Sequence, residues 1–248
     1  MNPQAWMILA AAPFVGSFLG VLVRRLPRGE PVLWSRSACS LCQATLAPLD
    51  LFPLISFAAS RGRCRHCDGR IAAFHPLIEL AALVVAASAV LAAQPDDLSG
   101  ALIANCVLGW ILLALAWTDA ETMLLPDLLT IPLMLAGFAE AWLLDASSLP
   151  DRALGACIGW SCLAGLGWLW RHWRGIDALG QGDAKLLAAA GAWLGWQVLP
   201  QVLVIAALAA IAVSLAINGR RIKAAQRIAF GPWLALGIWI VRLLWNEA

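Results

Sequence analysis

Residues 101–117 read ALIANCVLGWILLALAW, and this uncharged apolar stretch decides the fold. Similar stretches of about 16–19 residues recur along the chain, near the lower limit for a helix that crosses about 30 Å of hydrocarbon. They lie at 5–23, 77–93, 128–144, 153–170, 184–199, 201–217 and 228–244. Apolar residues follow one another without alternation, which argues against strands. The sequence therefore predicts an all-α fold, a polytopic membrane helix bundle of about eight spans.

The composition excludes several classes of protein. Of the 248 residues, 62% are hydrophobic and 13% are charged, whereas soluble domains average about 25% charged residues. So few charges cannot cover a water-soluble enzyme or support binding to nucleic acid. Seven cysteines are too few for a disulfide scaffold of this length.

The distribution of basic residues predicts the orientation in the membrane. Arg24 and Arg25 follow the first apolar stretch, which is unlike a secretory signal, so we expect that stretch to remain as a helix with its amino terminus outside. Eight spans then place both termini outside and segments 24–76, 118–127, 171–185 and 218–227 in the cytoplasm. These segments hold 15 of the 17 Lys and Arg residues. Such an excess is typical of cytoplasmic loops.

The first cytoplasmic segment, 24–76, contains two Cys-x-x-Cys pairs, Cys39 with Cys42 and Cys64 with Cys67. Two such turns supply four thiolates to a tetrahedral site, so we expect a structural zinc ion. Disulfides, a redox-active pair and free thiols are the alternatives, and a reducing cytoplasm argues against stable disulfides. His66 is predicted to lie on the surface. The three other cysteines are predicted to be small apolar packing residues: Cys106, Cys157 and Cys162.

Two aspartates are predicted at one membrane face. Asp119 follows the third apolar stretch, and Asp183 precedes the sixth in the sequence Gly180-Gln-Gly182-Asp183. Carboxylates at membrane depth are costly and are therefore functional candidates. Gly180 and Gly182 would let a substrate backbone approach Asp183. Asp127, which opens the fourth stretch, is predicted to be a helix N-cap.

A pair of close carboxylates can share one proton, so that one acts as general base and the other as general acid towards a peptide bond. A proton-coupled transporter can also use two aspartates, but those would be expected nearer the middle of the bilayer. The residues favour a membrane hydrolase, with an aspartate-coupled transporter carrying a zinc-stabilised loop as the alternative.

The order of short motifs resembles the type IV prepilin leader peptidase/N-methyltransferase family, the GxGD-type membrane aspartic proteases. Besides the two cysteine pairs and Asp119, the matching pieces are GSFL at 16–19, RLP at 25–27, PLIS at 53–56, RGRCR at 61–65, HPLIE at 75–79, LPDLLT at 125–130, GQGDAKLL at 180–187 and FGP at 230–232. The resemblance covers nearly the whole chain.

The resemblance implies that Asp119 and Asp183 form the catalytic pair of an enzyme in a bacterial inner membrane, with its active site at the cytoplasmic face. It implies cleavage of prepilins and prepilin-like secretion proteins after a leader-terminal Gly, then methylation of the new amino terminus from S-adenosylmethionine. Residues 1–100 would carry the zinc loop and methylation, and 101–248 the peptidase. The residues themselves reveal no S-adenosylmethionine site.

Overall fold

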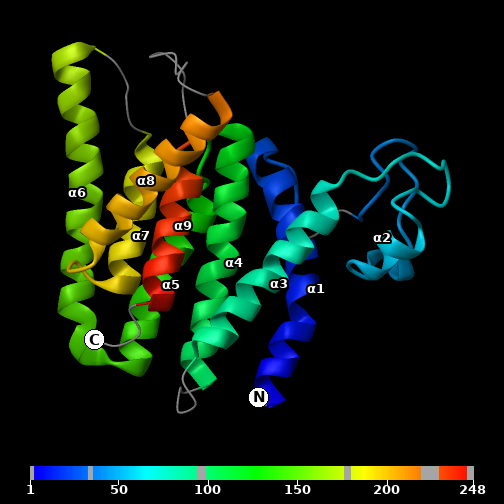
Figure 1. Ribbon diagram of the computed structural model, residues 1–248, viewed down its shortest axis with the longest axis horizontal. Helices are drawn as coiled ribbons and strands as arrows, with labels where there is room; N and C mark the ends of the chain where they lie inside the picture. Colours follow the sequence, from blue (N-terminus) through cyan, green and yellow to red (C-terminus); the bar gives the residue numbers. More distant parts are fainter. Residues whose placement is uncertain (1–2, 33–35, 94–98, 176–179, 219–228, 245–248) are drawn as a thin grey trace. The chain divides into compact units, whose positions relative to one another are not determined.

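The computed structural model describes residues 3–32, 36–93, 99–175, 180–218 and 229–244. In these ranges all regular secondary structure is helical, apart from two isolated β-bridges. The chain divides into two compact units, Met1–Leu102 and Ile103–Ala248 (Figure 1). The predicted all-α, polytopic fold is confirmed.

The first unit is built on two long helices, α1 (Pro3–Arg25) and α3 (Phe74–Ala92). Glycines let them pack closely, because a Cβ atom on Gly16 would lie 2.6 Å from the Cα of Glu79. The connection between them contains α2 (Ile55–Ala59) and two 3-10 turns, Leu26–Arg28 and Pro48–Leu51.

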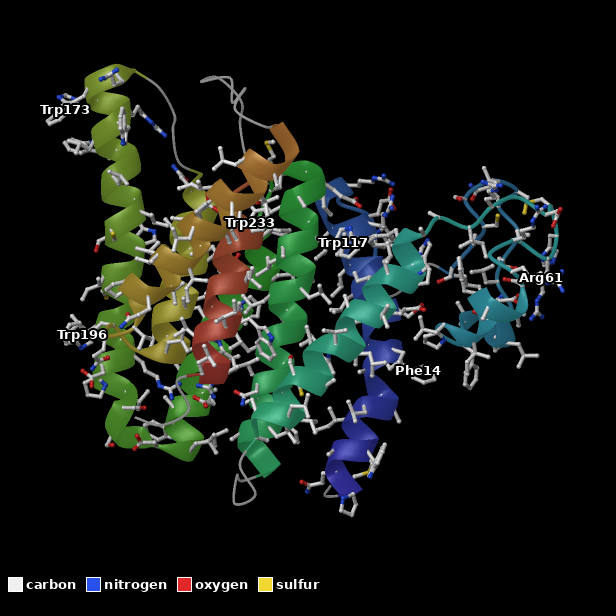
Figure 2. The ribbon with its side chains drawn as sticks, viewed as in Figure 1. Phe14, Arg61, Trp117, Trp173, Trp196 and Trp233 are labelled. Atoms are coloured by element: carbon white, nitrogen blue, oxygen red, sulfur yellow. The ribbon has the colours of Figure 1, made fainter. Side chains whose placement is uncertain are left out.

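The second unit is a helix bundle that begins within α4. Its helices are α4 (Ser99–Thr122), α5 (Asp127–Leu144), α6 (Leu149–Arg174), α7 (Gln181–Leu194), α8 (Leu199–Asn218) and α9 (Gly231–Leu244), with a 3-10 turn at Ala146–Ser148. One core of buried apolar side chains joins α4, α5, α6, α7, α8 and α9. Trp173 and Trp196 lie towards opposite ends of α6 (Figure 2), as expected for aromatic residues at membrane interfaces.

Each predicted span overlaps a helix, although the bounds and lengths differ. Among the described residues, six segments are long and apolar enough to cross a membrane: Pro3–Arg28, Phe74–Ala92, Gly100–Thr122, Asp127–Leu144, Ala146–Arg174 and Leu199–Ala216. Helices α7 and α9 have 14 residues each, or about 21 Å of length. Gly195, at φ 82°, ends α7 inside the predicted span 184–199. The basic residues predicted at 220–227 lie outside the described residues.

Helix α7 lies against α6 with their backbones in contact. A Cβ atom on Gly191 would lie 2.1 Å from the carbonyl carbon of Gly155, and one on Gly159 would lie 2.5 Å from the carbonyl oxygen of Leu187. On the α5 side, the indole Nε1 of Trp193 donates a hydrogen bond to the carbonyl of Leu133 at 2.7 Å. These contacts bury nearly all of α7 after its first turn.

A buried ion-pair network lies at the end of the second unit where α5 ends and α6 begins. Glu140 on α5, 8% exposed, pairs with Arg152 on α6 and, at 2.8 Å, with Arg242 on α9. Arg242 also donates to Asn105 on α4 at 2.7 Å. Arg152 and Arg242 are the two basic residues outside the predicted cytoplasmic segments, and both of these exceptions pair with Glu140.

We expect Gly191→Ala to destabilise the bundle, because the added methyl group meets the backbone of α6. Overpacking of this kind costs about 1–3 kcal/mol, and the effect is measured as a lower midpoint of thermal unfolding in detergent. Gly165→Ala on α6 is the matched control, since its Cβ would meet no atom within 4 Å. Equal midpoints for the two variants would contradict the close contact.

Candidate functional site

Asp119 lies in the last turn of α4 and is 5% exposed. The carboxyl end of a helix is an unfavourable place for an anion. The compensating group is the backbone N–H of Gly231, which donates to Oδ2 of Asp119 at 2.9 Å. Gly231 is the first residue of α9, and the amino end of a helix carries partial positive charge. The start of α9 thus stabilises the ionised form of Asp119.

Asp183 lies in the first turn of α7 and is half-buried. Its carboxylate accepts a hydrogen bond from the backbone N–H of Gly180, the N-cap residue, and experiences the negative charge of Asp119. The structure therefore brings Asp119 and Asp183 close enough for their charges to repel each other. Such a pair favours a state in which one carboxyl group keeps a proton.

The predicted N-cap role of Asp127 is wrong. Pro126 occupies the N-cap position and Asp127 is the first residue of α5, without a capping hydrogen bond. Its carboxylate instead binds Nζ of Lys185 on α7, at 2.6 and 2.8 Å. The sequence does not reveal this pairing, because the two residues are 58 positions apart.

The two glycines beside Asp183 have different surroundings. A Cβ atom on Gly182 would lie 2.9 Å from the Cβ of Leu125, whereas one on Gly180 would meet only the carboxylate of Asp183 and the backbone of Gly182. The small size of Gly182 therefore serves packing against the segment before α5. Approach of a substrate to Gly180 and Gly182 stays a prediction.

Gly231 is a site residue that the sequence reasoning missed. Its motif, Phe230-Gly231-Pro232, was noted without a role. A Cβ atom at this position would lie 2.6 Å from Oδ2 of Asp119, so only glycine permits the observed hydrogen bond. A Gly-Pro pair at the start of a helix was the available signal.

The four cysteines of the first unit converge on one point. Their sulfur atoms all lie within 4.8 Å of one another, with 4.0 Å between Cys39 and Cys67 and between Cys42 and Cys64. In a tetrahedral site with metal–sulfur bonds of about 2.3 Å, sulfur atoms are about 3.8 Å apart. The thiols are free rather than disulfide-bonded. This cluster can hold a metal ion.

The two cysteine pairs form matching turns. Short antiparallel bridges close them, Ala38 with Thr45 and Arg63 with Arg70, and the residue after each pair has a positive φ: 58° at Gln43 and 55° at Asp68. Gly69 has a packing role instead, because a Cβ atom there would lie 2.3 Å from Leu41 Cδ1 of the other turn. His66 is exposed, as predicted.

Backbone N–H groups point at the sulfur atoms of both turns. Those of Cys42 and Leu41 donate to Sγ of Cys39 and lower the pKa of this thiol to about 6. The N–H of His66 lies 3.5 Å from Sγ of Cys64. Because a metal binds the thiolate rather than the thiol, these donors prepare the turns for metal binding.

Two models of known protein families match the chain, one in each half. Residues 10–93 match the Bacterial Peptidase A24 N-terminal domain, and residues 106–215 match the Type IV leader peptidase family. The chain belongs to the type IV leader peptidase family. No solved structure matches it significantly.

Three relatives share most of their length with the chain, and each is named prepilin leader peptidase/N-methyltransferase. The protein of Burkholderia pseudomallei strain 1026b is 41% identical, over 90% of this chain and 80% of the relative. That of Aeromonas hydrophila is 36% identical, over 94% and 88% respectively. That of Pseudomonas aeruginosa PAO1 is 34% identical, over 94% and 87%.

We expect Gly231→Ala to reduce peptidase activity about 100-fold or more, because displacement of a catalytic group by about 1 Å has an effect of this size. The added methyl group would push the Asp119 carboxylate out of its hydrogen bond. The measurement is cleavage of a full-length prepilin by protein at matched membrane levels. Gly165→Ala is the control and should retain activity. Normal cleavage by Gly231→Ala would show that the hydrogen bond is dispensable.

Proposed function

We propose that the protein removes the leader from type IV prepilins and prepilin-like secretion proteins, cleaving after Gly, and then methylates the new amino terminus. The family and the names of the relatives support this proposal. The observation that carries the peptidase activity is the proximity of Asp119 and Asp183, each held in a terminal turn of its helix. The transporter alternative has no support from the comparisons.

The surroundings of the two aspartates suggest different roles. The Gly231 N–H and the start of α9 favour a charged Asp119, which would act as general base and take a proton from water. Burial, together with repulsion by that charge, favours a protonated Asp183, which would donate its proton to the carbonyl oxygen of the scissile peptide. The hydroxide left from that water adds to the carbonyl carbon. Asp119 then passes the proton it took to the amide nitrogen, and the C–N bond breaks.

We assign zinc to the site of Cys39, Cys42, Cys64 and Cys67, because four thiolates in tetrahedral arrangement suit that ion. Its role would be structural. In the described part of the segment between α1 and α3, Pro53 and Cys64 are the only buried residues. Such a segment has almost no apolar core of its own, and a metal would hold its turns together.

Residues 1–100 would carry methylation and residues 101–248 proteolysis, with S-adenosylmethionine supplying the methyl group. The distribution of Lys and Arg supports an orientation in the bacterial inner membrane with the cysteine segment and both aspartates on the cytoplasmic side. Prepilins and membrane lipid are then the partners, and nucleic acid is not.

We expect Asp119→Asn and Asp183→Asn each to abolish leader cleavage, because neither carboxylate can replace the other. The double variant should be no worse than either single variant, since groups that act as a unit are not additive. The measurement is cleavage of a full-length prepilin, with membrane levels checked by blotting.

Asp127→Asn is the matched control for these variants. Its salt bridge with Lys185 is largely exposed, and such pairs contribute about 0–1 kcal/mol, so cleavage should continue. Substantial cleavage by well-inserted Asp119→Asn or Asp183→Asn protein would exclude the aspartic protease assignment.

We expect the purified protein to contain about one zinc ion per chain. Cys42→Ser should lower the metal content and make the segment between α1 and α3 more sensitive to proteolysis. Cys157→Ser, at an exposed position on α6, is the control and should leave both unchanged. If the purified protein contains no metal and its segment between α1 and α3 still resists proteolysis, the zinc assignment is wrong.

A further inference from the structure

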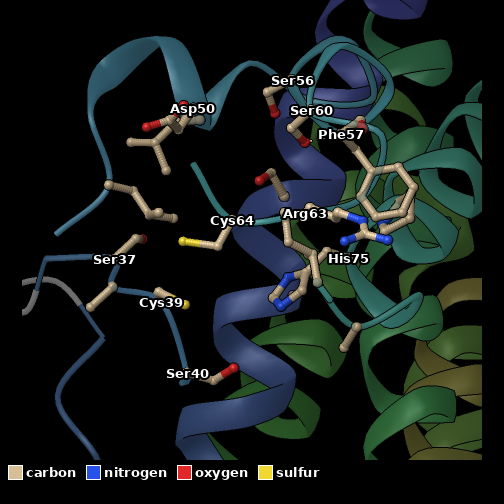
Figure 3. A pocket seen from close by; sticks show the side chains of 18 of the residues that line it. Ser37, Cys39, Ser40, Asp50, Ser56, Phe57, Ser60, Arg63, Cys64 and His75 are labelled. Atoms are coloured by element: carbon tan, nitrogen blue, oxygen red, sulfur yellow. Dashed lines mark hydrogen bonds between the residues drawn. The ribbon is translucent and has the colours of Figure 1, made fainter. Parts of the chain in front are cut away.

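The first unit contains a cavity of about 270 Å³. Its walls come from the carboxyl-terminal half of α1, the first turns of α3 and the segment between these helices that contains the four cysteines. Figure 3 shows Cys39, Cys64, Ser56 and His75 around this space. The volume is close to the lower end for small-molecule sites, about 300 Å³.

A buried carboxylate belongs to this cavity. Glu79 on α3 is 7% exposed and one helical turn beyond His75, on the same face of the helix. Its Oε2 accepts a hydrogen bond from the backbone N–H of Leu54 at 2.8 Å, and the hydroxyl of Ser17 on α1 donates to the same carboxylate. In the described part of the chain these two neutral donors, and no cation, are the partners of the Glu79 carboxylate.

The contact between Leu54 and Glu79 is made in a strained conformation. Leu54 has φ 58° and ψ −46°, a region that non-glycine residues rarely adopt. Strain of this kind persists where the surrounding structure holds it, and it gathers at binding sites. The carboxylate is thus held in a fixed position in the wall of the cavity.

Besides apolar side chains, the rest of the lining contains basic and polar residues. Five arginines contribute to it, together with five serines: Arg24, Arg25, Arg63, Arg65, Arg70, Ser17, Ser37, Ser40, Ser56 and Ser60. Arg65 pairs with Asp50, the other acidic residue of the lining, at 3.2 Å. A ligand that suits these walls carries both an anionic group for the arginines and a cationic group for Glu79. A purely anionic ligand, such as a lipid phosphate, would be repelled by the negative charge of Glu79.

We propose that this cavity binds S-adenosylmethionine, with Glu79 supplying the negative charge for the cationic groups of the methionine end. This ligand combines a carboxylate with ammonium and sulfonium charges, and its ribose and adenine offer partners to serine hydroxyls. The inference rests on the methyl-transfer part of the proposed function and gives that activity a site within the first unit.

The test is calorimetric binding of S-adenosylmethionine to the zinc-loaded, detergent-solubilised full chain. Glu79→Gln, which keeps the shape of the side chain and removes its charge, should weaken binding at least tenfold. Glu30→Gln is the matched control, because Glu30 is exposed and lies outside the cavity. Metal content and thermal unfolding of both variants are measured alongside.

A second pair of variants tests the cavity independently of the carboxylate. Ser56→Trp places a bulky side chain in the lining and should abolish binding, whereas Ala59→Trp on the exposed side of the same helix α2 should leave binding unchanged. Ultraviolet cross-linking of radiolabelled S-adenosylmethionine should label peptides within residues 17–79.

The outcomes separate the site from the activity. Wild-type binding and methylation, combined with unchanged binding by both Glu79→Gln and Ser56→Trp, would overturn the cavity assignment and leave methyl transfer standing. Cross-linking confined to residues 103–248 would overturn it as well. If the wild-type protein neither binds S-adenosylmethionine nor methylates a cleaved pilin, the proposed methyl transfer fails together with its site.

Discussion

Charged groups in a bundle without bulk water must be compensated by the protein itself, and this constraint shapes both units. Asp119 is compensated by the start of α9, and Glu140 by two arginines from other helices. Glu79 depends on a strained backbone N–H and a hydroxyl group. At Asp119, compensation brings the ends of several helices together and leaves a carboxylate that can react. At Glu140, compensation is by ion pairs, which hold helices together.

Backbone contact between α6 and α7 determines where the second aspartate lies. Gly155 and Gly159 remove the side chains that would separate the two helices, so α7 lies in the centre of the second unit. Its amino end then carries Asp183 to the carboxyl end of α4. The position of Asp183 in the candidate site therefore depends on glycines with no chemical function, which contact α7 more than one helical turn away.

The sequence predicted the elements of the fold and indicated candidate chemical residues, but it did not predict the contacts between them. Long apolar stretches identify helices by themselves, and Asp119 and Asp183 stand out because charges are rare in such stretches. The partners are separated by long distances in the chain: 112 positions from Asp119 to Gly231 and 58 from Asp127 to Lys185. The end of α7 was also misplaced, because Gly195 interrupts the helix within a continuous apolar stretch. Hydropathy does not register a change of backbone conformation.

The shortness of α7 has a consequence for how the protein is made. A 14-residue helix with Asp183 and Lys185 near its start is a weak signal for the insertion machinery, which favours long, uncharged segments. The surface that accepts it belongs largely to α6, the helix synthesised just before it. We expect α6 and α7 to enter the lipid together as a hairpin. The glycines between them would then decide how much of the newly made chain reaches the membrane in its correct topology, before any question of folded stability arises.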